Sequence, residues 1–122
     1  EIMPSLVGSE MCIRDRIIIL GVSYKADIND TRESPALDII QLLKNRSAIV
    51  EYNDPHVPTI ELFSENLNSK SIEANVLSEY DCTVITTNHN TYDRNKIVQN
   101  SQLIIDTRNA TKHINSDKIV KL

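Results

Sequence analysis

Two positively charged residues, Lys25 and Arg32, stand in a polar stretch between an apolar run at residues 17–20 and the pair Ser34-Pro35. That pair indicates a helix start, because serine is a favoured N-cap and proline fits the first helical turn. Lysine offers a mobile point charge and arginine a planar fork, and both groups bind phosphate oxygens well. A strand that opens into a cationic loop before a helix is a favourable place to hold a phosphate. The spacing therefore predicts an anion site in residues 21–35.

The elements that must position these residues follow from the hydrophobic pattern. Short apolar runs predict strands at residues 17–20, 48–52, 82–86, 103–105 and, at an edge, 118–122. Helical patterns predict helices at 34–46 and 92–100, a weaker helix at 59–67 and a short helical turn at 76–80, with a polar loop at 66–71. Alternating strands and helices are typical of a parallel sheet covered on both faces. The predicted fold class is α/β, a Rossmann-like three-layer sandwich with a mainly parallel sheet.

In such a sheet, ligands bind beyond the carboxyl ends of the strands. Three predicted loops meet that condition, and each carries polar or cationic residues. They hold Tyr24, Lys25 and Arg32 after the first strand, Asn88 and His89 after the third, and Arg108 and Asn109 after the fourth. We therefore expect these side chains to gather at one edge of the sheet.

Each candidate also has a purely structural interpretation. Lys25 can be a solvated loop lysine, and Arg108 can pair with Asp106. Arg32 has carboxylates nearby in the sequence with which it can form an ion pair, namely Asp27, Asp30 and Glu33. An ion pair does not exclude ligand binding, because a carboxylate can also orient a guanidinium. Both interpretations remain open for these three residues.

The histidines and cysteines indicate no catalytic or metal centre. His89 has no recognisable serine or cysteine nucleophile beside it, so we interpret it as a structural histidine with satisfied hydrogen bonds. His56 and His113 are expected in loops. The spacing of histidines, cysteines and carboxylates matches no metal site, and we predict none. The two cysteines, Cys12 and Cys82, are far apart and form no CxxC pair, which favours reduced thiols over a disulfide.

The composition sets broad limits on the function. The chain has 122 residues, 40% of them hydrophobic, and a formal net charge of −4. One domain with one core fits this length. An acidic balance argues against general binding to nucleic acid or to an anionic membrane. No apolar run approaches the ~20 residues that a membrane-spanning helix needs, and no signal peptide is recognisable. We therefore expect a cytoplasmic protein.

Residues 1–16 differ from the rest of the chain, since they show neither clear periodicity nor a partner pattern. The string from Val7 to Arg16 is similar to translated adapter or linker sequence. We interpret residues 1–16 as foreign or linker sequence and assign no chemistry to Cys12. A native connecting helix is the alternative.

Several motifs in order carry a resemblance to a known family. The segment Gly21-Val-Ser-Tyr-Lys-Ala-Asp-Ile-Asn-Asp-Thr-Arg-Glu-Ser-Pro35 resembles the signature G-x-x-[FY]-K-x-x-x-x-D-x-R-E-S-P of the UDP-glucose/GDP-mannose dehydrogenase family. Three later segments agree, namely Tyr52-Asn-Asp-Pro-His-Val-Pro58, Val84-Ile-Thr-Thr-Asn-His89 and Ile105-Asp-Thr-Arg-Asn-Ala110. The resemblance covers residues 17–122 and is to the C-terminal, UDP-sugar-binding domain. The second and fourth segments are most similar to the UDP-N-acetylglucosamine and UDP-N-acetylmannosamine 6-dehydrogenase branch.

The resemblance implies an enzyme that oxidises the C6 alcohol of a nucleotide sugar to a carboxylate in two steps, reducing two NAD. In that family an N-terminal Rossmann domain binds NAD through G-x-G-x-x-G, and a central helical region carries the nucleophilic cysteine. This chain has only two glycines, Gly8 and Gly21, so it does not contain the fingerprint. Cys82 lies in a predicted strand rather than in a glycine-rich loop. We therefore expect no catalytic residue and no redox activity in residues 17–122 alone.

The resemblance also implies roles for individual residues. Lys25 would contact the UDP-sugar with Tyr24 beside it, Arg108 would contact the same ligand, and Arg32 would reach NAD across the interdomain cleft. The implied partners are the UDP-sugar, the rest of the parent dehydrogenase and a second subunit of a full-length homodimer. NAD would be held mainly by the N-terminal domain, and the product would enter surface-polysaccharide synthesis.

Two other functions remain open. The chain can be a fragment of a UDP-glucose or GDP-mannose 6-dehydrogenase, which competition by UDP against GDP would partly separate. It can also be a stand-alone nucleotide-binding module without catalysis, which a start codon near residue 17 would favour.

Overall fold

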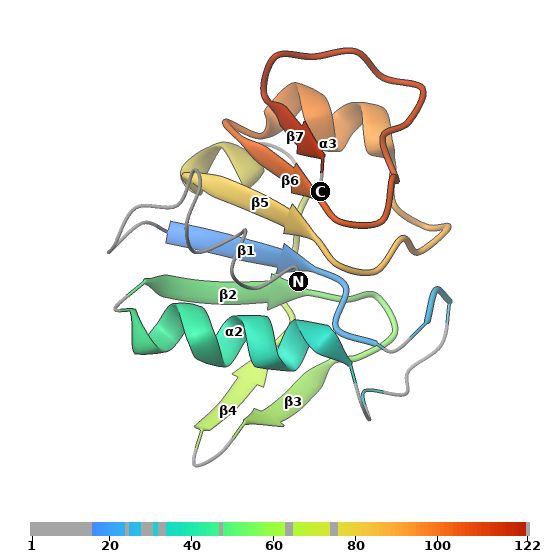
Figure 1. Cartoon of the computed structure of the whole chain (residues 1–122). Coiled ribbons are helices and arrows are strands. Elements are labelled where there is room, and N and C mark those ends of the chain that lie inside the picture. Colours follow the sequence, from blue (N-terminus) through green and yellow to red (C-terminus); the bar gives the residue numbers. More distant parts are fainter. Residues whose placement is uncertain are drawn as a thin grey trace.

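The computed structural model describes residues 16–23, 25–27, 31, 34–46, 48–62, 65–73 and 76–121 (Figure 1). Within these residues, five parallel strands form one sheet in the order β2-β1-β5-β6-β7. The strands are β1 (Arg16–Leu20), β2 (Ile49–Asn53), β5 (Cys82–Ile85), β6 (Ile104–Asp106) and β7 (Ile119–Lys121). All five predicted strands are confirmed.

The two central neighbours β1 and β5 mark the point where the strand order reverses. From β1 the chain continues to β2 on one side, and from β5 it continues to β6 and β7 on the other. Residues 17–20 are completely buried because both faces of β1 are covered, which explains their continuous apolar run. In sheets of this kind the crevice at the reversal point is where ligands bind. The fold thus points to the loops that follow β1 and β5.

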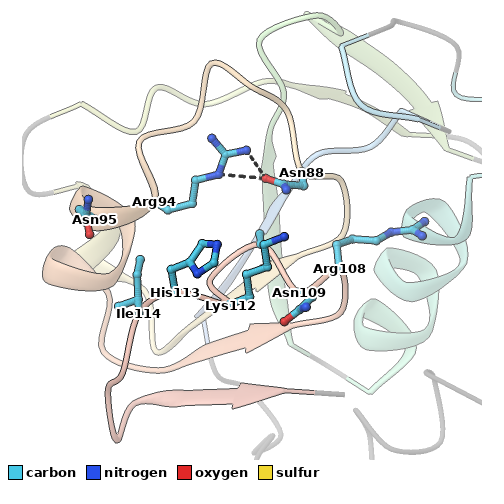
Figure 2. Close-up of a pocket in the computed structure, with 9 residues that line it drawn as sticks. Asn88, Arg94, Asn95, Arg108, Asn109, Lys112, His113 and Ile114 are labelled. Carbon is cyan, nitrogen blue, oxygen red and sulfur yellow. Dashed lines mark hydrogen bonds between the residues drawn. The ribbon is translucent and has the colours of Figure 1, made fainter.

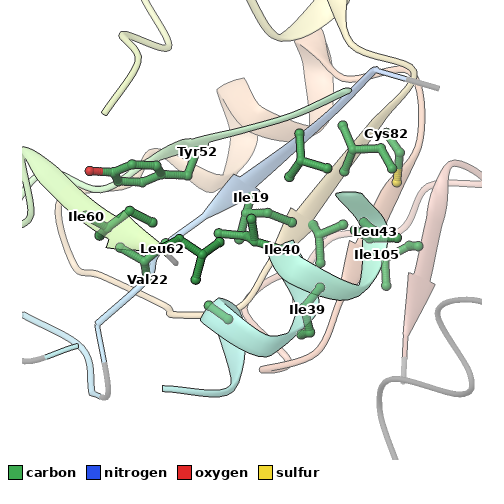
Figure 3. Packing of buried hydrophobic residues seen from close by; sticks show 14 of the residues in the cluster. Ile19, Val22, Ile39, Ile40, Leu43, Tyr52, Ile60, Leu62, Cys82 and Ile105 are labelled. Atoms are coloured by element: carbon green, nitrogen blue, oxygen red, sulfur yellow. The ribbon is translucent and has the colours of Figure 1, made fainter. Parts of the chain in front are cut away.

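Helix α2 (Pro35–Asn45) covers one face of the sheet (Figure 3). Its buried residues Ile39, Ile40 and Leu43 pack in one cluster with Ile17 and Ile19 of β1. The helix begins as predicted, because the Ser34 hydroxyl accepts a hydrogen bond from the Ala36 amide and Pro35 occupies the first turn.

The opposite face is covered by helix α3 (Arg94–Asn100) and the 3-10 turn η1 (Val76–Glu79). Ile97 and Leu77 from these elements pack with Ile18 and Leu20 of β1. Successive residues of β1 therefore face opposite clusters, as the pleat of a strand requires. Three layers result, which confirms the predicted α/β sandwich and the predicted helical turn.

The weaker helix predicted at residues 59–67 is wrong. These residues form an antiparallel hairpin of β3 (Thr59–Leu62) and β4 (Glu65–Asn68), so the predicted loop at 66–71 is also partly wrong. In β3, buried Ile60 and Leu62 alternate with exposed residues, which is the period of a strand rather than of a helix. Both side chains join the cluster beneath α2, and this packing selects the strand.

The structure bears on three further features of the sequence, namely Cys82, membrane-spanning helices and residues 1–16. Cys82 is buried in β5, as predicted. Among the described residues, no helix is long and apolar enough to cross a membrane. Residues 1–15, which include Cys12, lie outside the described residues, and so do the predicted site residues Tyr24 and Arg32.

Candidate functional site

The loops after β1, β5 and β6 enclose a pocket of about 290 Å³ at the carboxyl edge of the sheet. Its lining comprises Lys25, Ala26, Thr87, Asn88 and Arg108. Two of the predicted substrate residues, Lys25 and Arg108, thus line one pocket although they lie far apart in the chain. The pocket lies at the reversal point of the strand order, where a ligand is expected in an open α/β sheet.

The guanidinium of Arg108 is held by a neutral backbone acceptor. Its Nε donates to the carbonyl oxygen of Thr86 at 2.9 Å, which fixes the side chain across the end of β5. The alternative that Arg108 forms an ion pair with Asp106 is not observed, because that carboxylate accepts from the Arg108 backbone amide instead. The positive charge of Arg108 is oriented at the pocket without being neutralised by Asp106.

Asp106 is a fully buried carboxylate that shapes the loop carrying Arg108. It accepts hydrogen bonds from the backbone amides of Arg108, Ala110 and Thr111 and from the Thr111 hydroxyl. Burial raises the pKa of Asp106, but the hydrogen bonds from Thr111, Ala110 and Arg108 outweigh it and hold the pKa below its ordinary value. The ionised carboxylate therefore organises the turn after β6.

Replacing Asp106 with asparagine should destabilise the domain by about 2–3 kcal/mol at pH 7, because hydrogen bonds to a buried charge are lost. The pKa of Asp106 is lower in the folded state than in the unfolded state. Its ionised carboxylate therefore contributes fully to the folding stability above the unfolded-state pKa, and this contribution is lost as the pH falls through the folded-state pKa. Urea unfolding at pH 7 and pH 3 tests both points. The difference in the free energy of unfolding between wild type and Asp106→Asn should be smaller at pH 3 than at pH 7. A larger difference at pH 3 would contradict this role of Asp106.

A second buried carboxylate, Asp54, joins the loops that follow β1, β2 and β5. Its Oδ2 accepts from the backbone amides of Val22 at 2.8 Å and Ser23 at 3.2 Å, and from Nε2 of His89 at 2.9 Å. Its Oδ1 accepts from the amide of His56 at 2.8 Å. In the sequence, Asn53-Asp54-Pro55 gives only a turn signal, which does not predict this role of Asp54.

His89 is completely buried and uses both ring nitrogens. The backbone amide of Asp27 donates to Nδ1 at 2.7 Å, so Nδ1 is unprotonated and the proton resides on Nε2, which faces Asp54. The Ser23 hydroxyl lies 3.3 Å from Nε2 and donates to the Lys25 carbonyl at 2.7 Å. The interpretation of His89 as a satisfied structural histidine is confirmed, and the same contacts fix the backbone at Lys25.

Asp27, His56 and His89 form a group whose ligand atoms lie within 4.8 Å of one another, close enough to suggest a metal site among the described residues. Both nitrogens of His89 are already hydrogen-bonded, and the two carboxylate oxygens of Asp27 accept from the amide and side chain of Asn90. The hydrogen bond at a ring nitrogen of His89 would have to break before that nitrogen could bind a metal. The arrangement fits a network that closes the loops on one another better than it fits a metal centre.

A larger pocket of about 590 Å³ adjoins the first and shares Asn88 and Arg108 with it (Figure 2). It lies between the loop that leads into α3 and the turn after β6. Arg94, Lys112 and His113 line it, together with the amide side chains of Asn95 and Asn109. From the sequence, Asn109 is expected at the ligand-binding edge and His113 only in a loop, while Arg94, Asn95 and Lys112 look like ordinary surface residues before the two loops come together.

Known proteins are similar to this chain in sequence and in fold. Residues 18–113 match the UDP-glucose/GDP-mannose dehydrogenase family, UDP binding domain. The chain is 29% identical over 108 residues to the UDP-N-acetyl-D-mannosamine dehydrogenase of Methanococcus vannielii, covering 82% of this chain and 24% of that protein. It is 30% identical over 112 residues to the UDP-glucose 6-dehydrogenase of Rhizobium meliloti, covering 87% of this chain and 25% of that protein.

A solved structure agrees with these relatives. The UDP-D-ManNAc dehydrogenase from Pyrococcus horikoshii superimposes with a TM-score of 0.69 at 26% identity, over 98% of this chain and 28% of that one. The chain thus spans about a quarter of the length of the relatives that it matches. The shared fold and the family match over most of the chain identify it as a member of the UDP-glucose/GDP-mannose dehydrogenase family, corresponding to its UDP-binding domain.

Proposed function

We propose that this chain binds the UDP moiety of a UDP-N-acetylhexosamine as the C-terminal part of an NAD-dependent 6-dehydrogenase. The observation that carries the proposal is the pocket in which Lys25 and Arg108 meet at the reversal point of the sheet. A diphosphate offers several anionic oxygens, and an ammonium group together with a guanidinium held by a backbone carbonyl can bind them from two sides. The N-acetylhexosamine assignment follows the relatives that act on UDP-N-acetyl-D-mannosamine by name.

In this proposal the chain positions the substrate and does not carry out the oxidation. Tyr24 lies beside Lys25 in the sequence and would contact the same ligand, while Arg32 would reach NAD. Binding energy from the remote UDP group would hold the sugar C6 against the catalytic cysteine and the NAD of the remaining parent enzyme. The partners are then the UDP-sugar, the rest of that enzyme and a second subunit, and the compartment is the cytoplasm. No metal is part of this mechanism.

The Lys25→Ala variant tests the pocket directly. Its affinity for UDP should fall by about 1.5–3 kcal/mol, roughly 10- to 150-fold, because a charge-assisted contact is lost. Isothermal calorimetry of UDP with the 122-residue chain measures this loss. Lys96→Ala is the matched control, since Lys96 is exposed on α3 and lines neither pocket. Equal affinities of wild type and Lys25→Ala would remove Lys25 from the site.

A second candidate is a UDP-glucose 6-dehydrogenase, which the similarity to the Rhizobium meliloti enzyme favours. Both candidates bind UDP, so binding to this chain does not separate them. Turnover of UDP-glucose against UDP-N-acetylmannosamine by the complete parent enzyme does separate them. Preferential binding of GDP over UDP would contradict both.

A further inference from the structure

The larger pocket concentrates positive charge in a chain whose net charge is negative. Its lining includes the cations Arg94, Arg108 and Lys112 and the imidazole of His113, and none of the described lining residues is a carboxylate. The acidic residues next to it in sequence are already engaged. Asp93 caps α3 by accepting from the Lys96 amide, and Asp106 binds the amides of its own turn. Both carboxylates keep their charge, but neither forms a salt bridge with the described residues Arg94, Arg108 or Lys112.

Arg94 is fixed in place by acceptors that do not neutralise it. Its Nε donates to Oδ1 of Asn88 at 3.0 Å, its Nη2 donates to the same atom, and its Nη1 donates to the Tyr92 carbonyl at 2.8 Å. These neutral oxygens orient the guanidinium and leave its full positive charge in the pocket. A preorganised guanidinium loses less conformational freedom on binding than a mobile one.

Apart from the shared Arg108, the larger pocket has positively charged side chains of its own, Arg94 and Lys112. Figure 2 shows the side chain of Arg108 extending away from Arg94, Lys112 and His113. Arg108 is tied to the Thr86 carbonyl and lines the smaller pocket with Lys25. The two pockets thus each have a cationic group of their own, although they share part of their lining.

We propose that Arg94, Lys112 and His113 form a second anion site, separate from the Lys25–Arg108 pocket, for the phosphate group of a small phosphorylated metabolite. A phosphate presents three acceptor oxygens and a charge near −2, so it can engage several cations at once. A volume of about 590 Å³ exceeds what a bare phosphate fills, which leaves room for the rest of a small molecule. This inference does not rest on the proposed UDP function.

The test is a titration of the 122-residue chain with inorganic phosphate at constant ionic strength, followed through backbone amide resonances. Resonances of Lys112 and His113 should shift and saturate. In Lys112→Gln the phosphate affinity should fall about tenfold, as expected for the loss of one charge-assisted contact. Lys112 is exposed, so its substitution leaves the fold intact. The matched charge control Lys96→Gln should stay within about twofold of wild type.

A second variant separates this site from the smaller pocket. Lys25→Ala should bind phosphate at Lys112 and His113 as wild type does, whether or not it still binds UDP. If phosphate affinity there falls equally in Lys25→Ala and Lys112→Gln, one continuous site exists and the inference is wrong. It is also wrong if the Lys112 and His113 resonances do not respond, or if Lys96→Gln weakens binding as much as Lys112→Gln does.

Discussion

Replacing Gly21 with alanine is expected to destabilise the domain by about 3–4 kcal/mol, the sum of left-handed backbone strain and a steric clash. Gly21 follows β1 directly and has a φ of +91°, which side-chain-bearing residues rarely adopt. A Cβ at this position would lie 2.3 Å from Cβ of Thr87 and 2.8 Å from its carbonyl oxygen. The clash is with the backbone as well as with a side chain, so a rotamer change cannot relieve it.

Neither backbone can move away easily. The Gly21 amide donates to the Asn53 carbonyl at 2.8 Å, and the amides of Thr86 and Thr87 donate to the Leu20 carbonyl at 3.0 and 3.2 Å. These bonds hold the ends of β1, β2 and β5 together at the edge that carries the smaller pocket. The close approach requires glycine for this reason.

Urea unfolding followed by circular dichroism measures the loss. Asn109→Ala is the matched control, because Asn109 also has a positive φ, +57°, but is exposed in the turn after β6. It should cost no more than about 1–2 kcal/mol, the backbone term alone. If both variants lose the same stability, the contact with Thr87 contributes nothing and the steric argument fails.

Replacing Asp54 with alanine is the second large expected effect, a loss of about 3–5 kcal/mol of stability. The side chain of Asp54 is completely buried and accepts hydrogen bonds from three backbone amides and from His89. Its removal would leave these four donors without their acceptor in the interior, and each unsatisfied buried donor is costly. Because the donors come from three loops, the loop that carries Lys25 should loosen as well.

The Asp54→Asn variant should lose less stability than Asp54→Ala, because it keeps part of the hydrogen-bond network. Its amide oxygen can still face Val22, Ser23 and His89, but its NH₂ group then faces the His56 amide, where a donor meets a donor. We expect a loss of about 1–2 kcal/mol, smaller than that of alanine.

Hydrogen exchange at the Val22 and Ser23 amides distinguishes the network from general loss of packing. Both amides should exchange much faster in Asp54→Ala than the amides within β5 do, after correction for global stability. Unchanged protection of Val22 and Ser23 would show that Asp54 does not hold this loop.

Much of the fold was predictable because its signals are local. The run at residues 17–20 is apolar at every position, which indicates a strand covered on both faces, and Ser34-Pro35 marks the start of α2 correctly. The weaker helix predicted at residues 59–67 is wrong for a reason that lies outside this segment. The alternation of buried Ile60 and Leu62 with exposed residues is too short to distinguish a strand from a helix in the sequence. Only the packing of these two side chains beneath α2 selects a hairpin.

Some residues of the candidate site were predictable from the sequence, and others were revealed only by the structure. Lys25 and Arg108 were identified from their places after predicted strands and from the family signature, and they line one pocket. Asp54 was missed, since an aspartate before a proline gives the same local signal in any turn. Arg94 and Lys112 were missed because nothing near them in the sequence indicates a shared pocket.

The sequence by itself determined the alternation of elements, the parallel sheet and the family, because residue type and spacing encode local structure and motif order. The tertiary structure alone decided which distant loops meet, through strand order and buried hydrogen bonds. It joined Asp54 to His89, brought Gly21 against Thr87 and gathered Arg94, Lys112 and His113 around one pocket. Each of these contacts depends on the three-dimensional position of a partner far away in the chain, which local spacing does not specify.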